Sequence, residues 1–232
     1  MYERTIICLA NSRKPPSGRC VAGKELEGPR AGQWVRPVSS RPTREVSEEE
    51  RRYESGRKAQ LLDIVAVPLD RQSPDGHQTE NHVLADDYYW TQEGTATWDQ
   101  VKVLIDPYDP NFWIPAEHTR YGLNDKVSEL VATGIQSSLK LIVPDNLQIQ
   151  VLSEEGFEGR PSRKRVRAHF DYHRQTYTLS VTDPIVEDIY LPKPEGYYPD
   201  QTAILCISLA EPWNGYAFRL VASVITPNQC GE

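Results

Sequence analysis

The chain has 232 residues, of which 38% are hydrophobic, and its 26 basic and 33 acidic side chains give a net charge of −7. A chain this acidic is not expected to coat DNA without specificity, and it has no apolar stretch near the ~20 residues of a membrane-spanning helix. We therefore expect one large or two small domains, located in the cytoplasm and without membrane contact.

Apolar runs in the first half predict four strands, at residues 5–9, 19–23, 33–38 and 61–67. Pro37 lacks a backbone N–H, which places the third strand at a sheet edge or makes it end there. Residues 43–55 predict a polar helix, because Ser47 followed by Glu50 fits a capping box. Residues 78–84 predict a short strand or a loop.

A basic segment rich in glycine and proline, residues 12–41, interrupts these strands. It contains cations that suit phosphate groups and one aromatic ring that suits a base: Arg13, Lys14, Arg19, Lys24, Arg36 and Trp34. Arginine binds phosphate oxygens in a bidentate way, and glycine lets the backbone approach a ligand closely. The alternative is a set of solvated turn residues. Residues 1–58 hold 13 basic against 8 acidic side chains, which favours a local anion site.

The middle of the chain, residues 70–125, predicts a partly irregular connection. Pro107, Pro110 and Pro115 exclude a long regular element there. Within it, residues 97–105 predict a short helix followed by a strand.

The second half predicts short strands and one helix. The strands are expected at residues 139–143, 147–152, 165–172, 175–181, 203–209 and 216–225. Pro144-Asp145-Asn146 predicts a turn. Asp183 as N-cap and Pro184 in the first turn predict a helix through Tyr190.

Five or six short strands with one intervening helix are typical of the OB-fold, a small Greek-key barrel. We therefore predict a mainly β chain that folds as two consecutive OB-like small barrels, with short helices and a partly irregular middle segment. The expected division is an N-terminal barrel with insertions, residues 1–125, and a C-terminal barrel, residues 126–232.

A second basic run lies in the predicted hairpin of the second half. It consists of Arg163, Lys164, Arg165 and Arg167 and precedes two aromatic residues, Phe170 and Tyr172. OB-folds bind single strands with a basic groove and aromatic platforms, each stacked base contributing about 1–3 kcal/mol. The alternative is a solvated hairpin that its charges keep soluble.

Several short sequence motifs, taken in their order along the chain, resemble those of a known family. They are ICLANSRK at 7–14, GRCVAG at 18–23, WVRPV at 34–38, QTEN at 78–81, SLKLI at 138–142 and FRLVA at 218–222. They resemble the dual OB-containing domain family of prokaryotic proteins. The resemblance implies two OB-like barrels and a nucleic-acid- or nucleotide-binding role, but no catalytic residues. One departure is His82, where an aromatic residue such as tryptophan is expected.

No catalytic or metal-binding motif stands out in the chain. The four cysteines form no Cys-x-x-Cys pair, and the five histidines have no metal-ligand spacing. Asp86-Asp87 and Asp106 with Asp109 carry oxygen ligands that a divalent ion could use, but such acidic pairs are more common in surface turns. We expect no cofactor and no stoichiometric zinc.

The favoured hypothesis is a non-catalytic module that binds single-stranded nucleic acid or a nucleotide. As family context, it would act beside a partner enzyme of a defence or nucleic-acid-processing system. One alternative is a nuclease or nucleotide hydrolase, in which Lys24-Glu25 and Glu80-Asn81-His82 converge. Another is a protein-interaction scaffold with an exposed aromatic face formed by Trp90, Trp98, Phe112 and Trp113.

Overall fold

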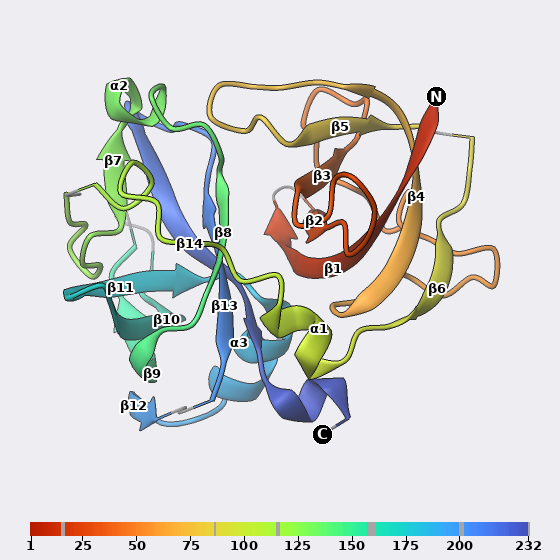
Figure 1. Ribbon diagram of the computed structural model, residues 1–232. Coiled ribbons are helices and arrows are strands. Elements are labelled where there is room, and N and C mark those ends of the chain that lie inside the picture. Colours follow the sequence, from red (N-terminus) through yellow and green to blue (C-terminus); the bar gives the residue numbers. More distant parts are fainter. Residues whose placement is uncertain (15–16, 86, 115–116, 157–160, 200–201, 232) are drawn as a thin grey trace.

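A computed structural model describes residues 1–14, 17–85, 87–114, 117–156, 161–199 and 202–231. Of the described residues, 49% are in strands and 9% in helices, so the prediction of a mainly β chain with little helix is confirmed. Figure 1 shows two groups of strands side by side, with α1, α3 and the C-terminal turn along one end of the seam between them.

The first barrel is organised by one long strand, β1 (Tyr2–Lys14). Its first half pairs antiparallel with β4 (Asp63–Gln72) and its second half with β2 (Gly18–Lys24). The register shifts between Cys8 and Ala10, where a bulge turns the strand from one partner to the other. Because of this bend, the single strand β1 pairs with both β4 and β2 and so closes the barrel.

Two short strands close this barrel. β2 pairs with β3 (Trp34–Val38), β3 pairs in parallel with β5 (Asn81–Leu84), and β5 pairs with β4. The ring is therefore β1-β2-β3-β5-β4-β1, the five-stranded Greek-key closure of an OB-fold. Pro37 lies near the end of β3, as its missing N–H predicts. β6 (Thr91–Thr95) extends the sheet outside the ring on β4.

The second barrel repeats this topology with its long strand broken in two. β8 (Leu139–Ile142) and β9 (Asp145–Glu154) are separated only by Val143 and Pro144. β8 pairs with the fourth strand of the barrel and β9 with the second, so together they take the role of β1. The predicted turn at Pro144 is thus a bend between two halves of one strand, because the proline cannot donate to the ladder.

The other strands of the second barrel are β10 (Arg163–Tyr172), β11 (Gln175–Val181), β13 (Ile204–Leu209) and β14 (Tyr216–Ile225). They complete the ring β8/β9-β10-β11-β14-β13, in which β11 and β14 are parallel, as are the third and fifth strands of the first barrel. Two short strands attach outside the ring, β7 (Lys126–Ser128) on β14 and β12 (Gly196–Pro199) on β9.

The helices are short, and capping residues next to them in the sequence determine where they begin. α3 (Pro184–Tyr190) lies between the third and fourth strands of the second barrel, with Asp183 as its N-cap, as predicted. α1 (Trp98–Lys102) confirms the helix expected in residues 97–105, although no strand follows it. α2 (Glu129–Ala132) and a 3-10 turn (Pro227–Cys230) are single turns.

The predicted helix at 43–55 is wrong. The capping box exists, because the Glu50 N–H donates to Ser47 Oγ at 3.1 Å and the Ser47 N–H donates to Glu50 Oε2 at 2.7 Å. The chain then turns away after one turn, because the buried Tyr53 donates from its hydroxyl to Asp63 Oδ2 at 2.7 Å. Tertiary burial overrides the local helix signal.

Each barrel has its own core, and a third cluster joins them. Ile7, Leu9 and Ala22 of the first barrel pack with apolar residues of β8, β13 and β14 such as Leu141 and Cys206. This continuous apolar seam holds the barrels together. The sheets occupy residues 2–95 and 126–225, while the exact division at residue 125 stays a prediction.

The aromatic face proposed for a scaffold does not exist. Trp90, Phe112 and Trp113 are at most 2% exposed, and Trp98 packs partly buried against the seam. Within the described residues, no helix is long and apolar enough to cross a membrane. The same part of the chain holds no cluster of three or more His, Cys, Asp or Glu side chains suited to a metal ion.

Candidate nucleic-acid interface

The end of the β1–β2 hairpin, which carries the first basic cluster, lies in the seam between the barrels. The Arg13 N–H donates to the carbonyl oxygen of Thr182 at 3.0 Å, and Arg13 Nε pairs with Glu187 Oε2 of α3 at 2.7 Å. Because side chains alternate along a strand, the hairpin presents different residues to its two sides. Two hollows adjoin the hairpin, and they share no lining residue.

The first of these, the Trp213 hollow, has a volume of about 410 Å³. It is lined by Ser12, Arg13, Lys14, Cys20, Arg36, Gln78, Thr182, Ser208, Ala210, Glu211, Trp213, Phe218 and Leu220. Three of the predicted phosphate-binding residues thus meet here, together with a set of apolar side chains from β13, β14 and their connecting turn.

Trp213 stands on a rigid turn at the rim of this hollow. Trp213 and Tyr216 exchange backbone hydrogen bonds of 2.8 and 3.1 Å, and Asn214 and Gly215 have φ of +50° and +78°, as a type I′ hairpin requires. The indole is 59% exposed. Sequence reasoning missed this residue, although Trp-Asn-Gly-Tyr is a hairpin-tip signal that places its aromatic flanks near the surface.

The cations of the Trp213 hollow are partly neutralised. Lys14 Nζ lies 2.7 Å from Glu211 Oε1, and its side chain is 20% exposed. Arg13 retains 55% side-chain exposure despite its contacts with Glu187 and Asp188. Lys14 and Arg13 therefore remain accessible to an anion, which must compete with these carboxylates.

Arg36 is buried in a clamp between the barrels. Its Nη2 donates to Ser138 Oγ at 2.7 Å and lies 3.1 Å from Glu80 Oε1. Glu80 also accepts from the Ser138 hydroxyl. His77 Nε2 donates to the carbonyl oxygen of Ala210 at 3.1 Å and Thr79 Oγ1 to that of Gln136 at 2.7 Å. The polar motif at 78–81 thus joins the barrels, and Arg36 is engaged there rather than free for a phosphate.

Lys24 and Trp34 belong to another internal cluster. Lys24 is 2% exposed, and its Nζ lies 2.7 Å from Asp106 Oδ1 and donates to the carbonyl oxygen of Leu104. Burial lowers the pKa of Lys24, and the Asp106 carboxylate opposes this shift. Trp34 donates from Nε1 to Asp106 Oδ2 at 3.1 Å. Asp106 also accepts from the Leu141 N–H, so this cluster fastens the first barrel to the second.

Replacing Trp34 with phenylalanine keeps most of the ring but removes the N–H donor to Asp106. We expect the free energy of unfolding to fall by about 1 kcal/mol, the usual net contribution of a hydrogen bond. Urea denaturation measures this loss. We also expect oligonucleotide affinity to stay unchanged, and a selective loss of affinity without loss of stability would show that Trp34 contacts the ligand instead.

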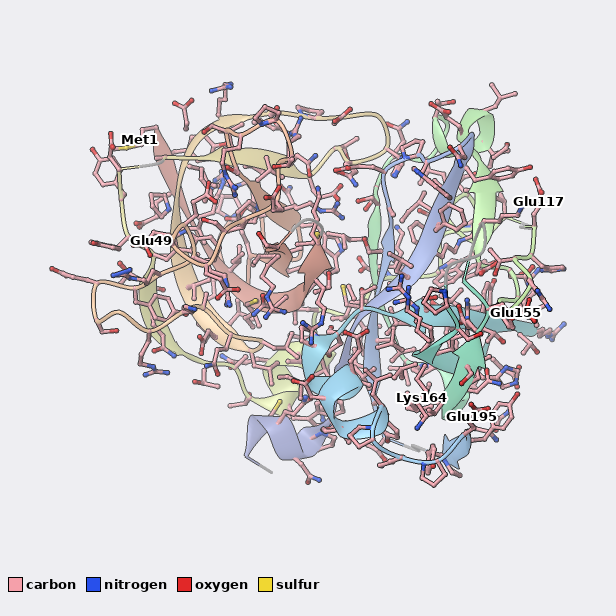
Figure 2. The ribbon with its side chains drawn as sticks, turned by 180° about the vertical axis from the view of Figure 1, so that it is seen from behind. Met1, Glu49, Glu117, Glu155, Lys164 and Glu195 are labelled. Carbon is pink, nitrogen blue, oxygen red and sulfur yellow. The ribbon has the colours of Figure 1, made fainter. Side chains whose placement is uncertain are left out.

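The second basic cluster divides into exposed and engaged residues. Arg163 and Arg165 are exposed, and within the described residues neither has an ion-pair partner. Lys164, labelled in Figure 2 among the side chains of the second barrel, donates to the carbonyl oxygens of Leu191 and Lys193. Arg167 is 5% exposed and pairs with carboxylates of Glu154 and Asp125. None of the four lines the Trp213 hollow.

The predicted base-stacking roles of Phe170 and Tyr172 conflict with their burial. Phe170 is fully buried and stacks on Tyr177 with ring centroids 5.5 Å apart, and Tyr172 is 8% exposed against Trp113. The reason is strand parity: Phe170 and Arg165 are five residues apart on β10, so they point to opposite faces. A base has no access to either ring.

The glycines of the basic segment also have an internal role. A Cβ on Gly23 would collide with the carbonyl oxygen of Ile7, and one on Gly18 with the side chain of Glu45 and the carbonyl oxygen of Val46. These two glycines therefore let β2 pack closely against its own neighbours.

Three loops that join strands of the two barrels contribute residues to the Trp213 hollow. Lys14 is at the start of the loop after the first strand, Gln78 lies between the fourth and fifth strands, and Trp213 lies between the fourth and fifth strands of the second barrel. These are the loops with which OB-folds bind oligonucleotides. A family model, the dual OB-containing domain, matches residues 4–224. The chain belongs to the dual OB-containing domain family.

This membership confirms the resemblance noted in the sequence, and it suggests a nucleic-acid-binding module of the OB type. Comparisons with curated proteins and with solved structures gave no match. At the departure from the family pattern, His82 is 8% exposed, and its Nδ1 hydrogen-bonds to the Tyr2 hydroxyl. Burial lowers the pKa of His82, which favours a neutral structural imidazole.

Proposed function

We propose that this dual OB protein binds single-stranded nucleic acid without chemical conversion, with a base held at the Trp213 hollow. The observation that carries the proposal is the half-exposed Trp213 indole, fixed on a type I′ turn above a hollow that the basic β1–β2 hairpin also lines. A large exposed aromatic on a rigid support suits base stacking, which every base permits through its π-face.

Phosphate contacts would come from two places. Lys14 and Arg13 flank the hollow and would exchange their carboxylate partners for backbone phosphates. Arg163 and Arg165 on β10 lie outside it and, in the described structure, have no protein partner to exchange. The acidic remainder of the chain would oppose non-specific binding of duplex DNA.

Salt titration separates these two kinds of contact. The affinity for a single-stranded oligonucleotide should fall with salt with a slope of about 0.7 per neutralised phosphate. Replacing both Arg163 and Arg165 with alanine should flatten the slope by about 1.4 if each contacts one phosphate. Replacing Lys14 with alanine should flatten the salt slope less. The Glu211 carboxylate that pairs with Lys14 in the wild type already neutralises part of the lysine charge.

Fluorescence anisotropy of a labelled oligonucleotide, measured at several salt concentrations, gives these slopes. Arg71, 65% exposed beside Asp70 on β4, is a matched control whose replacement should leave the slope unchanged. A wild type that binds no oligonucleotide or nucleotide at low salt would end the proposal. Equal salt slopes for the wild type and for the Arg163 and Arg165 double variant would show that these β10 residues do not contact the phosphates.

A nuclease or nucleotide hydrolase is the second candidate, since part of its predicted machinery does converge. Glu25, Glu80 and His82 line a common hollow of about 510 Å³ between the barrels. Each is nevertheless bound to a neighbouring side chain: Glu25 pairs with Arg4 and Arg30, Glu80 belongs to the inter-barrel clamp, and His82 Nδ1 hydrogen-bonds to Tyr2. We expect intact oligonucleotide and nucleotide after incubation with Mg²⁺, and cleavage abolished by Glu25→Gln would establish the enzyme instead.

A further inference from the structure

A second hollow, with a volume of about 280 Å³, also adjoins the β1–β2 hairpin. This Lys58 hollow is lined by Asn11, Arg19, Arg51, Lys58, Gln60, Leu61, Asp183, Pro184, Ile185 and Ser223. It lies between the first barrel and the start of α3, and it shares no lining residue with the Trp213 hollow. Figure 1 shows α3 at this end of the seam.

Three cations around this hollow share a single carboxylate. Glu48 lies 2.6 Å from Arg51 Nη2, 2.9 Å from Lys58 Nζ and 3.3 Å from Arg19 Nε. Burial alone would raise the pKa of Glu48, but hydrogen bonds from Lys58 and Arg51 and the charge of Arg51 lower it to about 2. The cluster therefore keeps a surplus of positive charge at neutral pH.

Two arginine donors in this cluster lack an acceptor. Arg51 is 5% exposed, and its Nε has no hydrogen-bond partner within the described residues; the same holds for Arg19 Nη1. The second carboxylate at the hollow, Asp183, accepts three backbone N–H groups, from Ile185, Val186 and Val224. Its charge is thus satisfied by α3 and β14. Glu48 is the carboxylate that the three cations share, and Arg51 also donates from Nη1 to the carbonyl oxygen of Ala59.

The geometry points to a phosphomonoester-binding site in the Lys58 hollow, apart from the proposed single-strand site. A phosphomonoester is close to a dianion at pH 7 and offers three strong acceptor oxygens, which match the two arginine donors without an acceptor and the neighbouring Lys58 ammonium. Leu61, Pro184 and Ile185 form an apolar wall for the organic part of the ligand. The small volume suits one such group, either on a mononucleotide or at the end of a strand.

Calorimetric titration of the full chain at low salt tests this site. The probes are inorganic phosphate, adenosine 5′-monophosphate, and one oligonucleotide with and without a 5′-phosphate. The proposal expects one phosphomonoester site per chain. The combined replacement Arg19→Gln and Lys58→Gln should weaken it about tenfold or more, as expected for losing hydrogen bonds to a charged group. Arg71→Gln, an exposed cation elsewhere, should have no effect.

The variant Glu48→Gln provides the more specific test. It removes the negative charge that pairs with all three cations, so it should tighten phosphate binding several-fold. A melting curve for each variant confirms that the fold is retained. A tighter binding of the oligonucleotide with a 5′-phosphate than of the same oligonucleotide without it, lost in the Arg19 and Lys58 double variant, would identify a strand end. Binding of the mononucleotide with no such gain for the oligonucleotide would identify a free nucleotide. The proposal is overturned if no phosphate probe binds, if the double variant binds like wild type, or if Glu48→Gln does not tighten binding. Trp213→Ala should leave phosphate binding unchanged. The proposals for this site and for the single-strand site are therefore tested independently.

Discussion

Replacing Arg36 with alanine is expected to lower the free energy of unfolding by about 3–5 kcal/mol, the usual cost of breaking a buried ion pair. The side chains of Arg36 and Glu80 are each 4% exposed, and they meet Ser138 of the second barrel. Removing the guanidinium leaves the Glu80 carboxylate buried with only the Ser138 hydroxyl and a weak N–H contact. Urea denaturation with a probe in each barrel measures the loss.

Two comparisons make this result specific. Arg71→Ala removes an arginine that is 65% exposed, and it should change stability by no more than about 0.5 kcal/mol. A double variant, Arg36→Met with Glu80→Leu, should lose less than Arg36→Ala alone, because it leaves no unpaired buried charge. If Arg36→Ala costs no more than Arg71→Ala, the clamp does not hold the barrels together.

The second large effect concerns binding. Trp213→Ala should weaken single-strand binding by about 1–3 kcal/mol, the contribution of one stacked base. Because the indole is uncharged, the salt slope should stay unchanged. Stability should change little, since the side chain is 59% exposed. Anisotropy titrations at three salt concentrations, with a melting curve for each variant, measure all three quantities.

Tyr89 provides the matched control for Trp213, because it is an aromatic residue of similar exposure, 56%, outside both hollows of the hairpin. Tyr89→Ala should leave affinity as it is. An equal loss of affinity in both variants would point to non-specific aromatic contacts, and no loss in Trp213→Ala would contradict stacking at the hollow.

The sequence was sufficient for most of the fold. Apolar runs such as residues 61–67 become barrel strands wherever the hydrophobic pattern and the turn residues agree. Asp183 caps α3 through local bonds from Ile185 and Val186, with Pro184 in the first turn. The helix predicted from Ser47 and Glu50 failed because the buried Tyr53 belongs to a tertiary contact that no local pattern reveals.

The site was harder to predict because the type of a residue does not reveal which other residues it contacts in the fold. Arg36 and Arg165 are both arginines on predicted strands, yet one is buried by Ser138, 102 positions away, and the other faces solvent. The burial of Phe170 could have been deduced from strand parity. Trp213 could have been found from its Asn-Gly turn, but its closeness to Lys14 depends on how the two barrels pack.

The most direct test of single-strand binding at the Trp213 hollow is fluorine NMR of protein labelled with 5-fluorotryptophan. The chain has five tryptophans, and Trp213→Phe identifies the resonance of Trp213. On titration with an unphosphorylated oligonucleotide, we expect this resonance to shift and to saturate with the affinity measured by anisotropy. The resonances of the buried Trp90 and Trp113 should hardly move. An oligonucleotide that binds while the Trp213 resonance stays in place would show that single strands bind elsewhere on the protein.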